Sequence, residues 1–316
     1  MTPHEENIYY GRFNLGVVSL NLPYIAYEAE QNINKFYEVL DKYCKLAFKA
    51  HMSRVNNLKK ATSNAAPLMW QHGILARLEP GESIEKLFYD NYATISLGYM
   101  GLYETTQLLT GLSHTDPRAN NFAKKILKKL NEYCAEWRFK TNISFSLYGT
   151  PSESLTDKFS RSIRETFDAN FRRWVTNSFH VDVTEEIDAF EKLKIESEFQ
   201  ALSPGGQISY VEVSGNIHKN PEALLALVKY IYETIGYAEC NLKLSYCHVC
   251  NTEGDVEVVH NQTTDELEFE CPVCGNRDTA SGSLETVVRV CGYLGSAQRG
   301  FNQGRMYDIA NRVIHL

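Results

Sequence analysis

Four cysteines arranged as two Cys-x2-Cys pairs constrain the fold of this chain more than any other feature. Twenty residues separate the pairs, which is the spacing of a zinc ribbon, where each pair sits on a tight turn and four thiolates close a tetrahedron. Pro272 and Gly275 supply turn residues, and residues 256–259 and 267–269 are expected to form strands between the pairs. The predicted Zn²⁺ ligands are Cys247, Cys250, Cys271 and Cys274.

A metal site closed by four thiolates has no open coordination position, so we expect it to stabilise the fold and not to catalyse. Two other roles for such a site are nucleic-acid reading and redox switching. His248 and His260 lie nearby in the sequence, but four cysteines already complete the site, so we interpret both histidines as bystanders.

Composition favours a globular chain. It has 316 residues, of which 43% are hydrophobic, enough for a substantial core. The net charge of −7 gives no footprint for binding DNA or RNA. We find no run of about 18 apolar residues and no basic-then-apolar N-terminus, so neither a membrane span nor a secretion signal is expected. A cytoplasmic location follows, where eight cysteines favour metal binding over disulfides.

Strand-like and helix-like segments alternate along the chain. Residues 16–23 are β-rich and end at a proline, and apolar residues then recur at helical spacing from 33 to 51. Residues 93–109 and 122–137 continue the pattern, 143–148 is another expected strand, and Asn220-Pro221 marks a helix start. Such alternation predicts a parallel α/β arrangement.

Residues 150–153 read Thr-Pro-Ser-Glu, a capping box with proline at the first helical position, so we predict that a helix begins there. A helix N-terminus offers free backbone N–H groups to an anion. From the sequence alone, simple capping of a helix is the more frequent use of this pattern.

The end of the chain reads RVCGYLG over residues 289–295, and FNQG follows at 301–304. Glycine alone lets its α-carbon flatten cheaply, as a backbone radical requires, although a simple turn would also suit Gly292. The segment resembles the glycyl radical loop of the anaerobic, class III ribonucleotide reductases. Further segments resemble that family in the same order; they are residues 11–23, 93–105, 146–155 and 205–212.

The resemblance implies that Gly292 stores a radical, installed by a separate activating enzyme that uses S-adenosylmethionine and an iron–sulfur cluster. It implies a fold that is the C-terminal half of a ten-stranded barrel. We divide the chain into a partial barrel with a nucleotide site (1–239), the zinc ribbon (240–279), and the radical loop with the C-terminal tail (280–316). The ribbon would brace the segment from about residue 280 that carries Gly292 into the barrel.

The resemblance also implies substrates and a reductant. The substrates are ribonucleoside triphosphates, with formate as reductant in many members; no cysteine pair follows Cys291, which agrees with formate. The segment at 146–155 makes Thr150, Ser152 and Ser154 candidates for binding substrate phosphates. Asn14 and Gln207 are candidates to line the same pocket, with surface-turn or strand hydrogen bonding as the alternative for each. Gln207 stands where the family would have histidine.

One residue of the family is absent. The thiyl radical cysteine precedes the segment that begins here at about Tyr9, and residues 1–8 contain no cysteine. We therefore expect an N-terminal half as partner, with a homodimer also possible. Cys44, Cys134 and Cys291 are interpreted as packing residues. The alternatives are a non-catalytic radical carrier, a zinc-binding interaction subunit, an inactive relic of a split gene, or a different glycyl radical enzyme.

Overall fold

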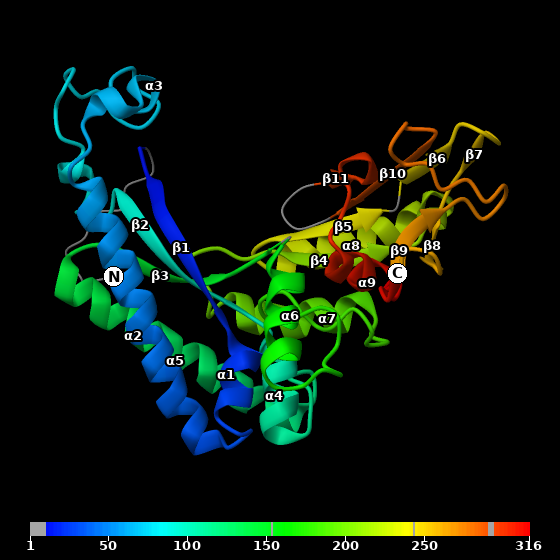
Figure 1. The fold of residues 1–316 in the computed structure, drawn as a ribbon, viewed down its shortest axis with the longest axis horizontal. Coiled ribbons are helices and arrows are strands. Elements are labelled where there is room, and N and C mark those ends of the chain that lie inside the picture. The colour runs from blue at the N-terminus through cyan, green and yellow to red at the C-terminus, as the bar shows by residue number, and fades with distance from the viewer. Residues whose placement is uncertain (1–10, 153, 243, 290–293) are drawn as a thin grey trace.

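The structure is a computed structural model that describes residues 11–152, 154–242, 244–289 and 294–316 (Figure 1). Its larger part contains strands β1 (Phe13–Asn21), β2 (Ala93–Met100), β3 (Ser144–Gly149), β4 (Ser209–Val213) and β5 (Ala238–Leu242). The helices of that part are α1 (Leu22–Glu28), α2 (Ile33–Leu58), α3 (Pro67–Trp70), α4 (Leu102–Thr110), α5 (Pro117–Thr141), α6 (Leu155–Thr166), α7 (Ala189–Gln200) and α8 (Pro221–Thr234).

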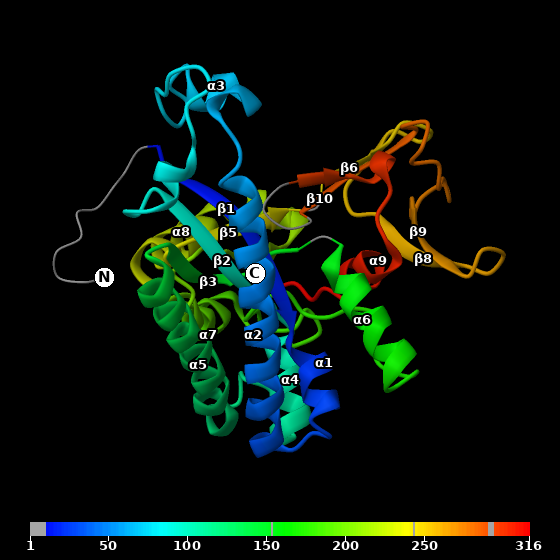
Figure 2. The same cartoon turned by 60° about the vertical axis from the view of Figure 1, so that its left-hand side comes forward.

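The three strands β1, β2 and β3 form a parallel sheet in that order, and its two faces differ. Val18, Leu97 and Leu147 lie side by side on one face. This face packs against the long helices α2 and α5 and forms the main hydrophobic core (Figures 1 and 2). Since side chains alternate along a strand, the residues between them point to the opposite face.

Two adjacent glycines, Gly205 and Gly206, contact β3 just before the chain enters β4. Gly205 donates its N–H to the carbonyl of Leu147 at 2.8 Å, and Gly149 donates to the carbonyl of Gly206 at 3.0 Å. A Cβ on Gly205 would lie 2.7 Å from the Leu147 oxygen, so only glycine permits this approach. The strands β4 and β5 then pair in parallel. The predicted parallel α/β arrangement is confirmed.

Capping residues set the ends of several helices. Asn220 accepts a hydrogen bond from the N–H of Ala223, and Pro221 follows at the first position of α8, as predicted. Asn32 and Asp116 cap α2 and α5 in the same way. Within the described residues, no helix combines the length and apolar character that crossing a membrane would require.

Two cysteines lie in the core that α2 and α5 share with the sheet. Cys44 is fully buried and Cys134 almost fully buried. Burial raises the pKa of both thiols, to about 12 for Cys134. Neither thiol therefore ionises readily, in line with the packing role expected for them. Cys291 falls outside the described residues.

The C-terminal part contains β6 (Leu244–Cys247), β7 (Thr252–Glu253), β8 (Glu257–Asn261), β9 (Glu266–Glu270), β10 (Leu284–Arg289), β11 (Leu294–Ser296) and α9 (Gln303–Ala310). One sheet has the order β11-β10-β6-β7, and β8 and β9 form a separate hairpin. The bounds of β8 and β9 differ by only one or two residues from those of the two strands expected between the cysteine pairs. A second hydrophobic core packs α9 against the strands of this part. Figure 1 shows it at the far end of the molecule from α2 and α3.

Leu97 provides a test of the main core. Leu97→Ala should lower the free energy of unfolding by about 2–5 kcal/mol, because it empties a fully buried site on the central strand. Leu225 on α8 is 70% exposed, so Leu225→Ala is the matched control and should change stability by less than about 0.5 kcal/mol. Urea unfolding monitored by circular dichroism measures both. Equal effects of the two substitutions would contradict the assigned core.

Candidate functional site

The four predicted zinc ligands converge into one cluster. Their sulfur atoms all lie within 4.8 Å of one another. Cys247 Sγ lies 3.5 Å from Cys274 Sγ, and Cys250 Sγ lies 3.6 Å from Cys271 Sγ. Zn–S bonds of about 2.3 Å in a tetrahedron place sulfur atoms about 3.8 Å apart, so the residues fit a Zn²⁺ ion held by four thiolates.

Neighbouring donors favour the thiolate that a metal requires at Cys247. Burial opposes ionisation there, but hydrogen bonds from the backbone of Cys250 and from the Asn276 amide outweigh it and lower the pKa of Cys247 to about 6. The two histidines take other partners: His248 faces Glu285, and His260 faces Asp265. Their interpretation as bystanders agrees with this geometry.

The cluster is joined directly to the strand that leads towards Gly292. Cys247 on β6 pairs with Leu284 on β10, and the antiparallel pairing continues to Val287. The strand β10 then ends at Arg289, which pairs with Leu294 on β11. Gly292 lies outside the described residues, between this pair. A brace from the cysteine cluster to the segment around residue 289 is thus present in the described residues.

The face of the β1-β2-β3 sheet that points away from α2 and α5 is polar. Asn14 donates from Nδ2 to Ser96 Oγ at 2.6 Å, and Ser19 Oγ lies 2.8 Å from Thr150 Oγ1. Gly98 lies between the latter two, and a Cβ there would come within 2.3 Å of both hydroxyl oxygens. The candidates Asn14 and Thr150 therefore belong to one polar surface.

The helix expected to begin at Thr150 begins later, which corrects the capping-box prediction. The helix α6 starts at Leu155 with Ser154 as the preceding residue. The Thr150 hydroxyl contacts Ser19 across the sheet and does not cap a helix. Ser152 Oγ instead accepts from the N–H of Leu155 at 3.1 Å, and the exposed Ser154 makes no capping hydrogen bond. Glu153 lies outside the described residues.

Gln207 lies at a different place from the other candidates. It follows the glycine pair beside β3, is half-buried, and its amide lies near Gly236 before β5. Thr150, Ser152 and Ser154 therefore lie just after β3, and Gln207 lies just before β4. Asn14 lies on the polar face at the level of the start of β3, since it pairs with Thr94 and Thr94 pairs with Ser144. The structure gives no hydrogen bond between Gln207 and the other candidates in its described residues.

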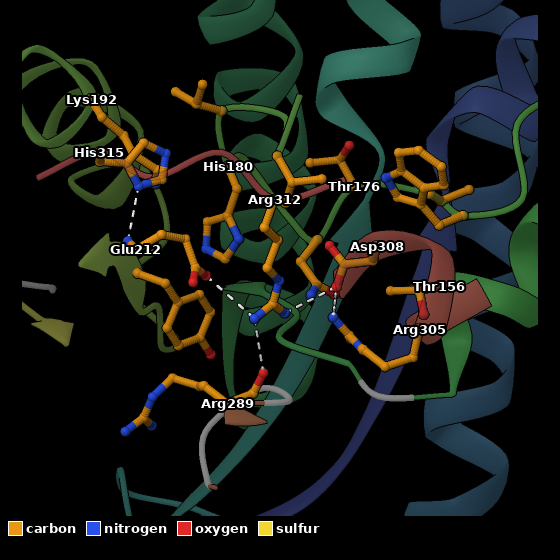
Figure 3. Close-up of a pocket in the computed structure, with 16 residues that line it drawn as sticks. Thr156, Thr176, His180, Lys192, Glu212, Arg289, Arg305, Asp308, Arg312 and His315 are labelled. Atoms are coloured by element: carbon orange, nitrogen blue, oxygen red, sulfur yellow. Dashed lines mark hydrogen bonds and ion pairs between the residues drawn. The ribbon is translucent and has the colours of Figure 1, made fainter. Parts of the chain in front are cut away.

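A small cavity of about 40 Å³ lies beside the start of α6 (Figure 3). Charged residues from distant parts of the chain meet there. Arg312 contacts Glu212 at 3.3 Å and Asp308 at 3.0 Å, and Arg305 contacts both Asp308 and, at 2.6 Å, the Ser152 carbonyl. The three-residue and four-residue spacings of Arg305, Asp308 and Arg312 were the available sequence signal for such ion pairs.

Solved structures show the same fold. An anaerobic ribonucleotide reductase matches with a TM-score of 0.68 and 20% identity, covering 94% of this chain and 44% of that chain. The anaerobic ribonucleotide reductase from Thermotoga maritima with glycerol in the active site matches with a TM-score of 0.64 and 19% identity, covering 92% and 43%. The chain thus has the α/β fold of class III reductases.

The sequence comparisons give the family. The family model described as anaerobic ribonucleoside-triphosphate reductase matches residues 2–315, and the chain belongs to this family. The enzyme of Salmonella typhimurium is 37% identical over 98% of this chain and 44% of its own length. That of bacteriophage T4 is 35% identical over 96% and 49%. The chain therefore spans less than half the length of these relatives.

Cys247→Ser tests the cysteine cluster. We expect bound zinc to fall from about one ion per chain to near zero and the C-terminal part to melt at lower temperature, because a ribbon without metal has little core of its own. Cys240→Ser, outside the cluster on β5, should keep the zinc. Elemental analysis and thermal melting measure this. Full zinc content and unchanged melting in Cys247→Ser would defeat the assignment.

Gly98→Ala tests the polar face. The added methyl group meets two hydroxyl oxygens and must separate Ser19 from Thr150, so we expect a loss of about 1–3 kcal/mol in the free energy of unfolding. Gly215→Ala adds the same methyl group where the nearest described atom, Asp255 Oδ1, would lie 3.9 Å away, and it serves as the matched control with an expected change below about 0.5 kcal/mol. Chemical unfolding compares the two. A Gly98→Ala variant as stable as the wild type would exclude the close contact.

Proposed function

We propose that the chain is the C-terminal, glycyl radical half of an anaerobic ribonucleoside-triphosphate reductase. The observation that carries the proposal is the pairing of β10 with β6. It connects the strand that leads into the RVCGYLG segment to the cysteine cluster. A radical store needs such a fixed stem, and a closed zinc site provides it without chemistry of its own. Family membership over residues 2–315 supports the assignment.

In this proposal Gly292 stores the radical, and an activating enzyme with S-adenosylmethionine and an iron–sulfur cluster installs it. The radical at Gly292 takes the hydrogen atom from a cysteine thiol of the N-terminal half, and the resulting thiyl radical abstracts the 3′ hydrogen of a ribonucleotide. The 2′ hydroxyl is protonated and leaves as water. Formate is the proposed reductant, since its oxidation to carbon dioxide supplies the two electrons. Zn²⁺, held by the four cysteines, stabilises the stem of the loop.

The substrate site is proposed at the end of β3. Thr150, Ser152 and Ser154 precede α6, and the positive end of its helix dipole favours the phosphates of a ribonucleoside triphosphate. Asn14 belongs to the polar face that leads to Thr150, and Gln207 approaches from the start of β4. Polar side chains on a sheet face opposite to its helices are expected where that face lines a substrate cavity.

The sheet offers a place for the missing half. Among the described residues β1 pairs only with β2, so its other edge is open. A groove of about 350 Å³ runs beside this edge between β1, α2 and Phe159, and its lining includes Leu20, Tyr24 and Leu46. An open edge beside apolar surface favours pairing with further strands. We propose that the N-terminal half completes a ten-stranded barrel here.

The domain division at residues 239 and 279 remains part of the proposal, with β6 and β10 of the last two pieces sharing one sheet. A homodimer is a further possibility within it. The alternative is a non-catalytic radical carrier or relic. It is favoured by the burial of Cys44 and Cys134, which leaves neither thiol on the polar face to act as thiyl radical.

Electron paramagnetic resonance tests the proposal. The chain is incubated without oxygen with a reduced activating enzyme and S-adenosylmethionine, alone and with an N-terminal half, and Gly292→Ala is the control. We expect a doublet from the single α-hydrogen of Gly292, absent in the control. A doublet seen only after the N-terminal half is added means that assembly precedes activation. Silence in both samples would reject the radical role and favour the relic.

A further inference from the structure

Arg289 is the last described residue before the segment that carries Gly292, and its position is fixed by three different groups. Its backbone N–H donates to Asn241 Oδ1 at 3.3 Å. Its carbonyl oxygen accepts from Arg312 Nη1 at 3.2 Å. Its guanidinium forms an ion pair with Glu239. The backbone at this point is therefore held through both its N–H and its carbonyl, and Figure 3 shows the contact from Arg312 to the carbonyl.

The two groups that hold the Arg289 backbone are themselves linked through Glu212. Asn241 donates from Nδ2 to both carboxylate oxygens of Glu212, at 2.7 and 2.6 Å. Arg312 contacts the same carboxylate at 3.3 Å and reaches Asp308 at 3.0 Å. The side chains of Glu212 and Arg312 are only 10% and 8% exposed. Side chains from β4, β5 and the C-terminal tail thus converge on Arg289, the last residue of β10, which we call the loop stem.

Burial makes this arrangement rigid. Moving Arg312 away would leave Asp308 paired with Arg305 alone and Glu212 without the counter-ion that it has in the described structure. Water barely reaches this place, so the loss costs far more than breaking an exposed ion pair. Burial by itself would lower the pKa of Arg312, but Asp308 and Glu212 outweigh it and raise the pKa, so the side chain stays charged. The contacts with these two carboxylates also fix the orientation of the Arg312 guanidinium.

We propose that Arg312, together with Asn241 and Glu212, positions the loop stem at Arg289 so that Gly292 is held where it can exchange its radical. The inference rests on the proposed function, since it assigns these residues to that same loop. Arg312 is a positioning residue in this account because it acts through the backbone of Arg289. None of the three residues belongs to the RVCGYLG motif.

A simpler role for Arg312 would be to staple α9 to the rest of the fold. Arg305 separates the two roles. It lies on α9, is fully buried and shares Asp308 with Arg312, but it contacts the Ser152 carbonyl and has no contact with Arg289 in the described structure. Loosening of α9 should therefore follow from substitution of either arginine, whereas loss of the stem contact follows only from substitution of Arg312.

The experiment measures radical per chain in the enzyme assembled with its N-terminal half and activating enzyme, by double integration of the electron paramagnetic resonance signal. The variants are Arg312→Lys, Asn241→Ala and Arg305→Lys. We expect roughly tenfold less radical in the first two, the scale of one hydrogen bond to a charged group, and a near wild-type amount in Arg305→Lys. Thermal melting and zinc content identify any variant that is simply unfolded.

Each outcome is decisive. A loss of radical in Arg312→Lys and Asn241→Ala, with melting and zinc retained, supports positioning of the stem. Wild-type radical in both folded variants overturns the inference and leaves the proposed function standing. Equal losses in Arg312→Lys and Arg305→Lys overturn it in favour of the α9 staple. No doublet in the assembled wild-type enzyme overturns the proposed function, and the inference with it.

Discussion

The pairing of β10 with β6 is the constraint on which the C-terminal part of the structure depends. It places Leu284 opposite Cys247, a member of the four-cysteine cluster, and it aligns β10 so that its last residue reaches β5. The small second core around Phe269 and Leu284 buries little apolar surface, so such a module needs a metal to remain folded. In the proposed account, zinc binding and the alignment of β10 with β6 therefore depend on each other.

The second organising feature is the difference between the two faces of the parallel sheet. Sheets of this kind are usually covered by helices on both faces. Here α2 and α5 cover one face, while the other is lined by Asn14, Ser19, Ser96 and Thr150, and the edge strand β1 has no second partner among the described residues. In our proposal, the N-terminal half meets the sheet at this edge and leaves the polar face to the substrate.

Local patterns in the sequence predicted local structure well. The cysteine spacing gave the cluster, Asn220-Pro221 gave the start of α8, and alternation gave the parallel sheet. The predicted start of α6 was wrong because a capping pattern competes with contacts that the sequence does not display. The Thr150 hydroxyl contacts Ser19, which is 131 residues away. The contacts of Arg312 with Glu212 and with the Arg289 carbonyl were hidden for the same reason, since three separate elements create them.

The absence of a side chain on glycine explains why contacts from distant residues are needed beside the proposed radical loop. A residue without a side chain has nothing of its own that can be packed or hydrogen-bonded beyond its backbone, so its place must be set by the residues next to it. Arg289 meets this need through its backbone N–H and carbonyl, which any residue except proline would offer at that position. In the proposed account, the sequence information that positions Gly292 therefore lies in Asn241, Glu212 and Arg312. Since that information lies outside the motif, a chain can keep RVCGYLG intact and still lose the geometry that the motif requires.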